Sequence, residues 1–353
     1  MVSAKNIISA RTEYAELHCH SWFSFKEGAS SPHDLVTTAL NLEYKALALT
    51  DHDSLAGAME FAQISKTLGL KSIIGSEITL QGEEHVTVLA SDHQGYSNLC
   101  KLLSFSHVSA EERSKPLLDK SVLQEYSKGL ILLSGCSWGV VGSLVSQNKL
   151  KEAEHKALEF KECFGDRYYI ELQRNMVKGD TKRNRHLVEI AKKLNIEIVA
   201  TNNVHYHHKS YSNLQDAMVA IKANKSLEEV QHLLRGNNEF YLKSPQEMTN
   251  IFSELPEAIS NTLLISEKCS FDLASGLGYK LPNYNTPEGY TSLTYLWELC
   301  VRAGLRRYGN LSYGVKKRLK EEFRLIEKHN LAGFLLIYHE IVGMAKEIMD
   351  RLG

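Results

Sequence analysis

The chain lacks several features that would place it in a specialised class of protein. Its 353 residues contain no apolar run of the roughly 18 residues that a membrane-spanning helix needs. Residues 1–11 lack the apolar core of a secretion signal, so we expect a cytoplasmic protein. The formal net charge is -1, which excludes the strong overall positive charge of many nonspecific nucleic-acid binders.

Cysteine is also scarce, and its spacing excludes a disulfide-rich scaffold. The chain has 6 cysteines, and no two of them form a CxxC pair. This pattern fits reduced thiols, any of which could serve as a metal ligand.

Short β-rich runs alternate with segments of helical periodicity as far as residue 201. The expected strands cover residues 46–50, 71–75, 85–90, 129–134, 168–172 and 197–201. Strict alternation of strands and helices predicts a parallel sheet, and this many units favours a closed or nearly closed (β/α) barrel.

Beyond these units the pattern becomes helical. A segment rich in glycine and proline, residues 274–290, reads as a linker, and three helices are expected after it. We therefore expect a barrel with a helical tail in residues 1–275, a linker in 276–290 and a helical segment in 291–353.

Side chains that can bind metals fall where the expected strands give way to loops. The carboxyl ends of barrel strands meet at one rim, so side chains that are distant in sequence would converge there. His18 and His20 lie on one side of an extended segment. The other candidates are His52, Glu77, His85, Cys136 and His205, of which His85 fits less well because it opens its strand.

Each candidate has a plainer interpretation when it is taken alone. His18 and His20 could be a coincidence, residues 50–53 a helix N-cap cluster, Glu77 a surface acid and Cys136 an inert thiol. Their joint placement at strand ends favours a metal site instead. Asp51 and Asp53 flank His52 and are expected to orient its imidazole as a second shell of ligands.

The donor types indicate which metals and which chemistry to expect. A mixture of imidazole, carboxylate and thiolate favours zinc, manganese or iron over magnesium or calcium. Neighbouring ions of this kind generate hydroxide and stabilise both the attacking and the leaving oxygen of a phosphate ester. The sequence therefore predicts phosphoesterase chemistry.

The segments that carry these residues resemble the polymerase and histidinol phosphatase (PHP) domain of bacterial DNA polymerase III α subunits, which are C-family polymerases. The similar segments are ELHCH at 16–20, FKEGA at 25–29, LTDHD at 49–53, IGSE at 74–77, LSGC at 133–136 and ATNNVHY at 200–206. Residues 295–299, 304–308, 321–327 and 338–341 resemble the start of the palm of these enzymes.

The resemblance implies a distorted (β/α)7 barrel of PHP type, with up to three divalent metal ions, followed by a partial palm segment. The ligands that it implies are His18, His20, Glu27, His52, Glu77, His85, Cys136, Asn203 and His205. Glu27 and Asn203 stand where the family usually has aspartates. Since an amide brings no negative charge, we expect Asn203 to weaken ion binding.

The resemblance leaves two functions open. The site is either a 3′–5′ exonuclease acting on DNA or a metal-binding scaffold that supports the polymerase and docks a proofreading subunit. The expected partners are primer–template DNA and other replisome subunits. The chain ends before the family's Gly-Arg-Gly-Ser segment and magnesium-binding aspartates, so we expect a fragment that cannot polymerise alone. A free-standing histidinol phosphatase is disfavoured because it has no use for palm-like helices.

Overall fold

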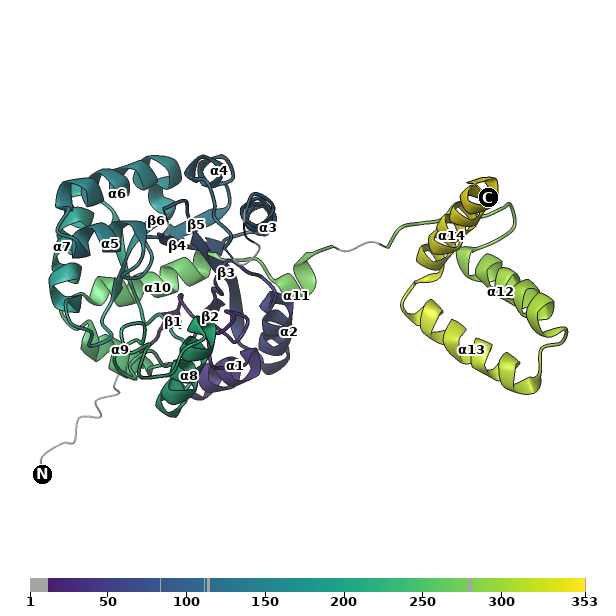
Figure 1. The fold of residues 1–353 in the computed structure, drawn as a ribbon, viewed down its shortest axis with the longest axis horizontal. Coiled ribbons are helices and arrows are strands. Elements are labelled where there is room, and N and C mark those ends of the chain that lie inside the picture. The colour runs from purple at the N-terminus through teal and green to yellow at the C-terminus, as the bar shows by residue number, and fades with distance from the viewer. Residues whose placement is uncertain (1–11, 83, 111, 113–114, 279–280, 353) are drawn as a thin grey trace, which may run out of the picture. The chain divides into compact units, whose positions relative to one another are not determined.

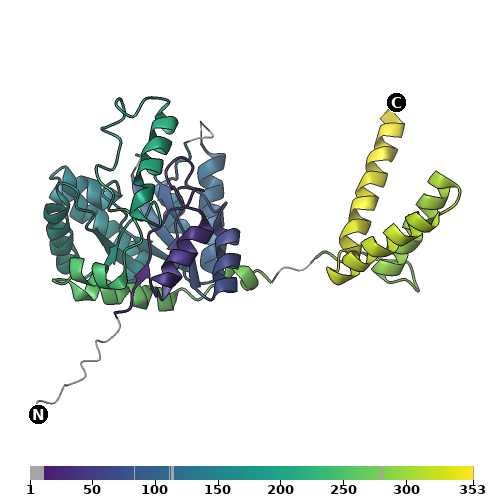
Figure 2. The same ribbon diagram turned by 90° about the horizontal axis from the view of Figure 1, so that it is seen from below.

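A computed structural model describes residues 12–82, 84–110, 112, 115–278 and 281–352 of the chain. It divides into two compact units, Met1–Leu277 and Gly278–Gly353. Figures 1 and 2 show a barrel-like sheet surrounded by helices in the first unit and a small group of helices in the second.

The first unit is built on a sheet whose strands lie side by side in chain order. The strands are β1 (Ala15–Glu16), β2 (Ala46–Leu49), β3 (Lys71–Thr79), β4 (His85–Ala90), β5 (Leu130–Leu133), β6 (Tyr168–Gln173) and β7 (Glu197–Thr201). The runs of apolar residues in the sequence predict all of them except β1, which has only 2 residues and therefore shows no alternation.

One strand runs against the others, so the prediction of a fully parallel sheet is wrong. Strand β4 pairs antiparallel with both β3 and β5, whereas the other neighbouring strands pair in parallel. The reason is the short connection between Thr79 and His85, since a parallel return needs a crossover of about a dozen residues or more. The reversal places His85, the first residue of β4, opposite Thr79, near the carboxyl end of β3.

The sheet is nearly closed by residues that follow β1 and β7. Cys19 and Val204 form an isolated parallel bridge. The amide of His20 donates to the Val204 carbonyl over 2.8 Å, and the amide of Val204 donates to the His18 carbonyl over 2.9 Å. The closure brings the histidines after β1 beside the segment after β7. The prediction of a distorted barrel of seven strands is confirmed by this architecture.

Helices cover the outside of the barrel (Figures 1 and 2). They are α1 (Pro32–Asn41), α2 (Ala58–Leu68), α3 (His93–Val108), α4 (Lys120–Glu125), α5 (Val140–Ser146), α6 (Leu150–Phe164), α7 (Asp180–Leu194), α8 (Ser212–Ala223), α9 (Pro245–Ile251), α10 (Pro256–Lys268) and α11 (Leu273–Gly276). Ser31 and Ser244 begin α1 and α9 with capping boxes, and each is followed by a proline suited to the first helical turn.

Helix α10 packs against the end of the barrel where β1 and β7 begin. Asn261 donates from Nδ2 to the Ile198 carbonyl over 2.8 Å, and the Ala15 amide donates to Thr262 Oγ1 over 3.3 Å. Ile265 and Cys269 join the apolar cluster formed by barrel residues such as Ala46. Helix α10 thus covers this end of the barrel, and the metal-binding candidates lie at the carboxyl ends of the strands.

The second unit consists of α12 (Ser292–Tyr308), α13 (Tyr313–Lys328) and α14 (Ala332–Leu352). Leu296, Phe323, Ala332 and Leu336 form its small core. Trp297 packs edge-on against Phe323 with 4.9 Å between the ring centroids. No helix among the residues that the structure describes is long and apolar enough to cross a membrane.

Candidate metal centre

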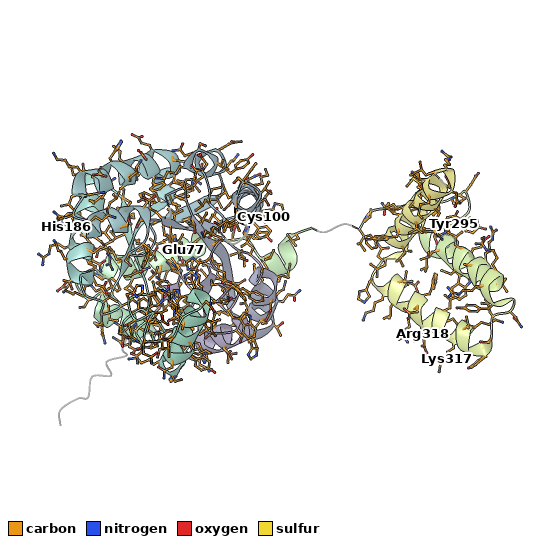
Figure 3. The ribbon with its side chains drawn as sticks, in the orientation of Figure 1. Glu77, Cys100, His186, Tyr295, Lys317 and Arg318 are labelled. Atoms are coloured by element: carbon orange, nitrogen blue, oxygen red, sulfur yellow. The ribbon has the colours of Figure 1, made fainter. Side chains whose placement is uncertain are left out.

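Glu77 lies at the centre of a cluster of side chains at the open rim of the barrel. Figure 3 shows it in the middle of the unit, whereas His186 on α7 and Cys100 on α3 lie on the outside. The Glu77 carboxylate contacts His18 Nε2 at 3.2 Å, His20 Nε2 at 3.2 Å, His52 Nε2 at 3.4 Å, His85 Nδ1 at 3.3 Å and Cys136 Sγ at 3.5 Å. The predicted donors from four other segments therefore meet around one carboxylate.

Strand β3 carries Glu77 inside its length, not after its end. The sequence predicts that this strand stops at Gly75, but pairing with β4 extends it to Thr79, and Glu77 lies opposite Thr87. The Asp53 amide donates to the Glu77 carbonyl over 2.9 Å, which holds the loop after β2 against β3. Consequently, His52 and Glu77 are held together by backbone hydrogen bonds as well as by their side chains.

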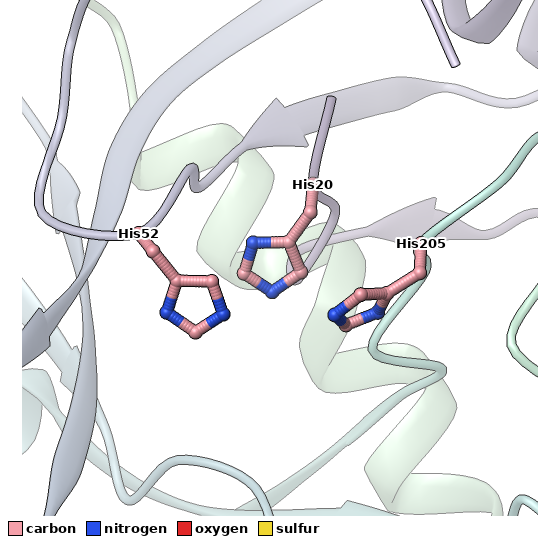
Figure 4. A group of neighbouring side chains, drawn as sticks. All are labelled: His20, His52 and His205. Carbon is pink, nitrogen blue, oxygen red and sulfur yellow. The ribbon is translucent and has the colours of Figure 1, made fainter. Parts of the chain in front are cut away.

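His20, His52 and His205 form a second convergence, from the loops after β1, β2 and β7 (Figure 4). The rings of His20 and His52 stack with 4.5 Å between centroids and an interplanar angle of 10°. The centroids of His20 and His205 lie 4.4 Å apart. The histidines that follow the first, second and last strands of the barrel therefore lie in one group.

Three groups of donors within the described residues have the spacing to hold a metal ion. The donor atoms of each group lie within 4.8 Å of one another. The groups are His18, His20 and Glu77; His52, Glu77 and His85; and His20, His52 and His205. Glu77 belongs to two of the groups, and its two carboxylate oxygens could bridge ions at adjacent positions, whereas His20 and His52 can each serve only one ion at a time.

The remaining predicted ligands, Glu27 and Asn203, lie beside the same cluster. Glu27 contacts His52 Nε2 at 2.9 Å through Oε2 and pairs with Lys222 through its other oxygen. Asn203 is 3% exposed, and its Oδ1 has no hydrogen-bond partner among the described residues. An unsatisfied buried oxygen is costly, and a cation would satisfy it. The donor set thus fits divalent metal ions.

The carboxylates of the cluster favour positive charge on two of the neighbouring histidines. Burial opposes ionisation of Glu77, but His52 and His18 outweigh it and hold the pKa of Glu77 well below its usual range. Burial likewise opposes protonation of His18 and His52. The neighbouring carboxylates of Glu171 and Glu77 nevertheless raise the pKa of His18 to about 10. Those of Glu77 and Glu27 raise the pKa of His52 to about 9.

Two histidines of the cluster remain neutral. Burial, together with the charge of His52, lowers the pKa of His20 to about 3. Burial and the neighbouring Arg235 hold the pKa of His205 well below its usual range. Neutral imidazole is the form that binds metal ions.

Glu171 is a buried carboxylate that the sequence analysis missed. Its Oε1 lies 2.7 Å from His18 Nδ1, and Gln173 Nε2 donates to the same oxygen over 2.7 Å. This contact orients the His18 ring so that Nε2 faces Glu77. Polar residues at alternate positions of an otherwise apolar strand, Glu171 and Gln173 in β6, were the signal that could have revealed it.

Asp51 and Asp53 make other contacts than the predicted one with the His52 imidazole. Asp51 accepts hydrogen bonds from the amide and hydroxyl of Ser21, at 2.7 and 2.8 Å, and from the Ser24 hydroxyl at 2.7 Å. Asp53 accepts from the Thr79 amide at 2.8 Å and from its hydroxyl at 2.7 Å. The two aspartates therefore hold the loop after His20 and the end of β3 in place.

A cavity of about 600 Å³ lies along α3, away from this cluster. Tyr96, Cys100, Phe105, Val108 and Leu277 contribute to its mostly apolar lining, and it shares no residue with the donor groups. The donor groups of the rim therefore lie outside this cavity.

Comparison with known proteins identifies the barrel. Residues 16–175 match the PHP domain family. The chain contains a PHP domain. It is 33% identical to an error-prone DNA polymerase of Symbiobacterium thermophilum over 351 residues, which cover 95% of this chain and 32% of that protein. It is also 33% identical to the DNA polymerase III subunit alpha of Borreliella burgdorferi, covering 96% of this chain and 31% of that protein.

The resemblance inferred from the motifs is thus confirmed. The chain spans about a third of the length of the curated relatives that it matches. Among solved structures, a provisionally named metal-dependent phosphoesterase from Bifidobacterium adolescentis is similar with a TM-score of 0.38 and 18% identity. That match covers 56% of this chain and 88% of the other.

Proposed function

We propose that the rim of this PHP domain binds divalent metal ions and hydrolyses phosphodiester bonds at the 3′ end of DNA, within a bacterial DNA polymerase III alpha subunit or error-prone polymerase. The observation that carries the proposal is the contact of one buried carboxylate, Glu77, with four imidazoles and a thiol within 3.5 Å. Polymerisation, binding of primer–template DNA and association with other replisome subunits belong to the same proposal for the whole protein.

The side chains that would hold the ions are the imidazole, carboxylate, thiol and amide donors of the rim, and zinc, manganese or iron suits them best. They are His18, His20, Glu27, His52, Glu77, His85, Cys136, Asn203 and His205. When bound, such ions activate water and stabilise charge on the phosphoryl oxygens of a substrate.

The chain's own residues would prepare the rim for these ions. Glu171 holds the Nδ1 proton of His18, so Nε2 faces Glu77 and is the nitrogen that would bind a cation in exchange for its own proton. Burial of His18, His20 and Glu77 excludes bulk water and strengthens every electrostatic interaction between them. The loops are held by Asp51 and Asp53, so the donors are in place before ions bind.

A second function is favoured by Asn203. Asn203 lies two residues before His205, with its carbonyl 2.9 Å from His205 Nδ1, and its neutral side chain would give an ion there less negative charge than a carboxylate provides. In this alternative the rim binds metal only to hold the loops together, and the domain acts as a scaffold for the polymerase or for a separate proofreading subunit.

Metal analysis combined with an exonuclease assay tests both functions. The purified chain is loaded with zinc or manganese, desalted, analysed for metal and incubated with a primer that carries a mismatched 3′ end. We expect bound metal and release of 3′ nucleotides, both of which are lost in Glu77→Gln. His186→Ala, on the outer helix α7, should match the wild-type protein.

The outcomes separate the two functions. Bound metal without cleavage supports the scaffold. The absence of bound metal from the wild-type protein contradicts both.

A further inference from the structure

Arg235 contacts the metal-binding nitrogen of His205. His205 Nδ1 lies 2.9 Å from the Asn203 carbonyl, which can only accept, so Nδ1 carries the proton and Nε2 carries the lone pair. The guanidinium of Arg235 donates from Nη2 to this Nε2. The lone pair that would bind a cation is therefore occupied by a side chain of the protein.

The guanidinium is held at this position by its surroundings. It lies over the ring of Phe240, 4.8 Å from the centroid, and the carbonyl of Phe240 accepts the His205 amide over 2.8 Å. Arg235 Nε is buried without a hydrogen-bond partner among the described residues. Arg235 and His205 thus both contact Phe240, the first through its ring and the second through its backbone carbonyl.

The charges around Arg235 are those that a metal ion would meet. Burial opposes the charge of the guanidinium, and the acidic groups that favour it are Glu27, Cys136, Glu77 and Tyr206. The first three belong to the predicted ligand set. The permanent positive charge of Arg235 therefore balances negative charge of the rim, as a bound cation would.

Asn203 and Arg235 act in the same direction. The side chain of Asn203, two residues before His205, brings no negative charge, and Arg235 places one positive charge at His205. Both features disfavour an ion in the group formed by His20, His52 and His205, whereas Arg235 makes no hydrogen bond to the two groups that contain Glu77, among the described residues.

We propose that Arg235 takes the place of one metal ion at His205, so that the rim loads cations only at the two groups that contain Glu77. The proposal rests on the proposed function for the metal binding of those two groups. In this role the guanidinium is a cation that belongs to the protein itself. The positive charge at His205 therefore does not depend on the supply of metal.

Metal stoichiometry tests this role directly. Wild type, Arg235→Met and Arg235→Gln are loaded with excess zinc, passed through a desalting column and analysed by mass spectrometry for zinc per chain. We expect each variant to retain one more zinc ion than the wild-type protein. Circular dichroism and thermal melting establish that the variants are folded.

Arg174→Met is the matched control. Like Arg235, Arg174 lies over an aromatic ring, 5.4 Å from the Phe252 centroid, and has a buried Nε without a partner among the described residues. Its Nη1 donates to the Ile251 carbonyl over 2.8 Å, away from the donor groups. Its zinc content should equal that of the wild-type protein.

The outcomes distinguish the two levels of the proposal. Equal zinc content in wild type and in folded Arg235 variants overturns the role of Arg235 and leaves the proposed function intact. The absence of zinc from every protein contradicts the proposed function itself. If Arg174→Met also gains zinc, the gain does not depend on the contact between Arg235 and His205. That result would overturn the proposed role of Arg235 as well.

Discussion

Glu171 and His18 form a buried carboxylate–imidazole pair with 2.7 Å between Oε1 and Nδ1. His18 is fully buried and its other nitrogen faces Glu77, so the pair links β6 to the centre of the rim. Carboxylates in this position raise the basicity of an imidazole ligand and fix its orientation.

Replacing Glu171 should therefore weaken metal binding without removing a ligand. We expect Glu171→Gln to lower zinc affinity by about 10- to 100-fold, the usual effect of losing such a partner. Competition titration with a zinc chelator measures the change. Glu197→Gln, at the exposed start of β7, is the control, and equal affinities for both variants would show that Glu171 does not support the site.

Asn203→Asp should restore negative charge beside His205, and its effect should depend on Arg235. In wild type the new carboxylate would pair with the guanidinium, so zinc affinity should change little. In the Arg235→Met background the same change should tighten binding of the additional ion by about tenfold, which corresponds to about 1.4 kcal/mol. Calorimetric titration of the two single variants and the double variant measures this coupling; identical gains in both backgrounds would contradict it.

Metal removal should destabilise the PHP unit. A ligand at 100 times its dissociation constant stabilises the native state by about 2.7 kcal/mol, and for a unit of this size that corresponds to several degrees in melting temperature. We expect a chelator to lower the melting temperature of the wild-type protein by this amount. Glu77→Gln should show no response, and a response equal to that of the wild type would place the bound metal elsewhere.

The packing of α10 against the end of the barrel predicts that two neighbouring positions of this helix contribute differently to the free energy of unfolding. Ile265 is fully buried in the barrel interior, whereas Leu264 is 51% exposed. Truncation of a buried isoleucine leaves a cavity, so Ile265→Ala should lower the free energy of unfolding by about 2–5 kcal/mol. Leu264→Ala should change it by about 0.5 kcal/mol or less. Urea denaturation followed by circular dichroism measures both, and similar losses would contradict the packing of α10.

Much of the barrel could be predicted from the sequence because its strands are short, apolar and separated by amphipathic helices. Strand β1 could not be predicted, because its 2 residues are too few to show the alternation of side chains that is typical of a strand. The reversal of β4 was missed because alternation was assumed throughout, although the connection from Thr79 to His85 is too short for a parallel crossover. Helix α8 was also missed, and it buries only Gln215 and Ala220, so its apolar face is weak.

The site was predictable where a donor stands at a strand end, as His52 and His205 do. Glu27 was reached only through the family resemblance, because an acid in a loop has no local signature. Glu171 and Arg235 were missed for a different reason. Whether a charged side chain points to the interior or to solvent depends on the tertiary structure, and a sequence pattern of a few residues does not contain that information.

The reversed strand also sets how tolerant the rim is to mutation. Glu77 and His85 lie on the two strands of one antiparallel hairpin, β3 and β4. In this hairpin Thr79 pairs with His85. Slippage of that hairpin by one residue would turn Glu77 toward the surrounding helices and remove the shared carboxylate from every imidazole at once. The length of the connection between Thr79 and His85, which has none of the expected ligands, therefore sets the register of the whole centre, and a change in that length should abolish metal binding more completely than the loss of any single histidine.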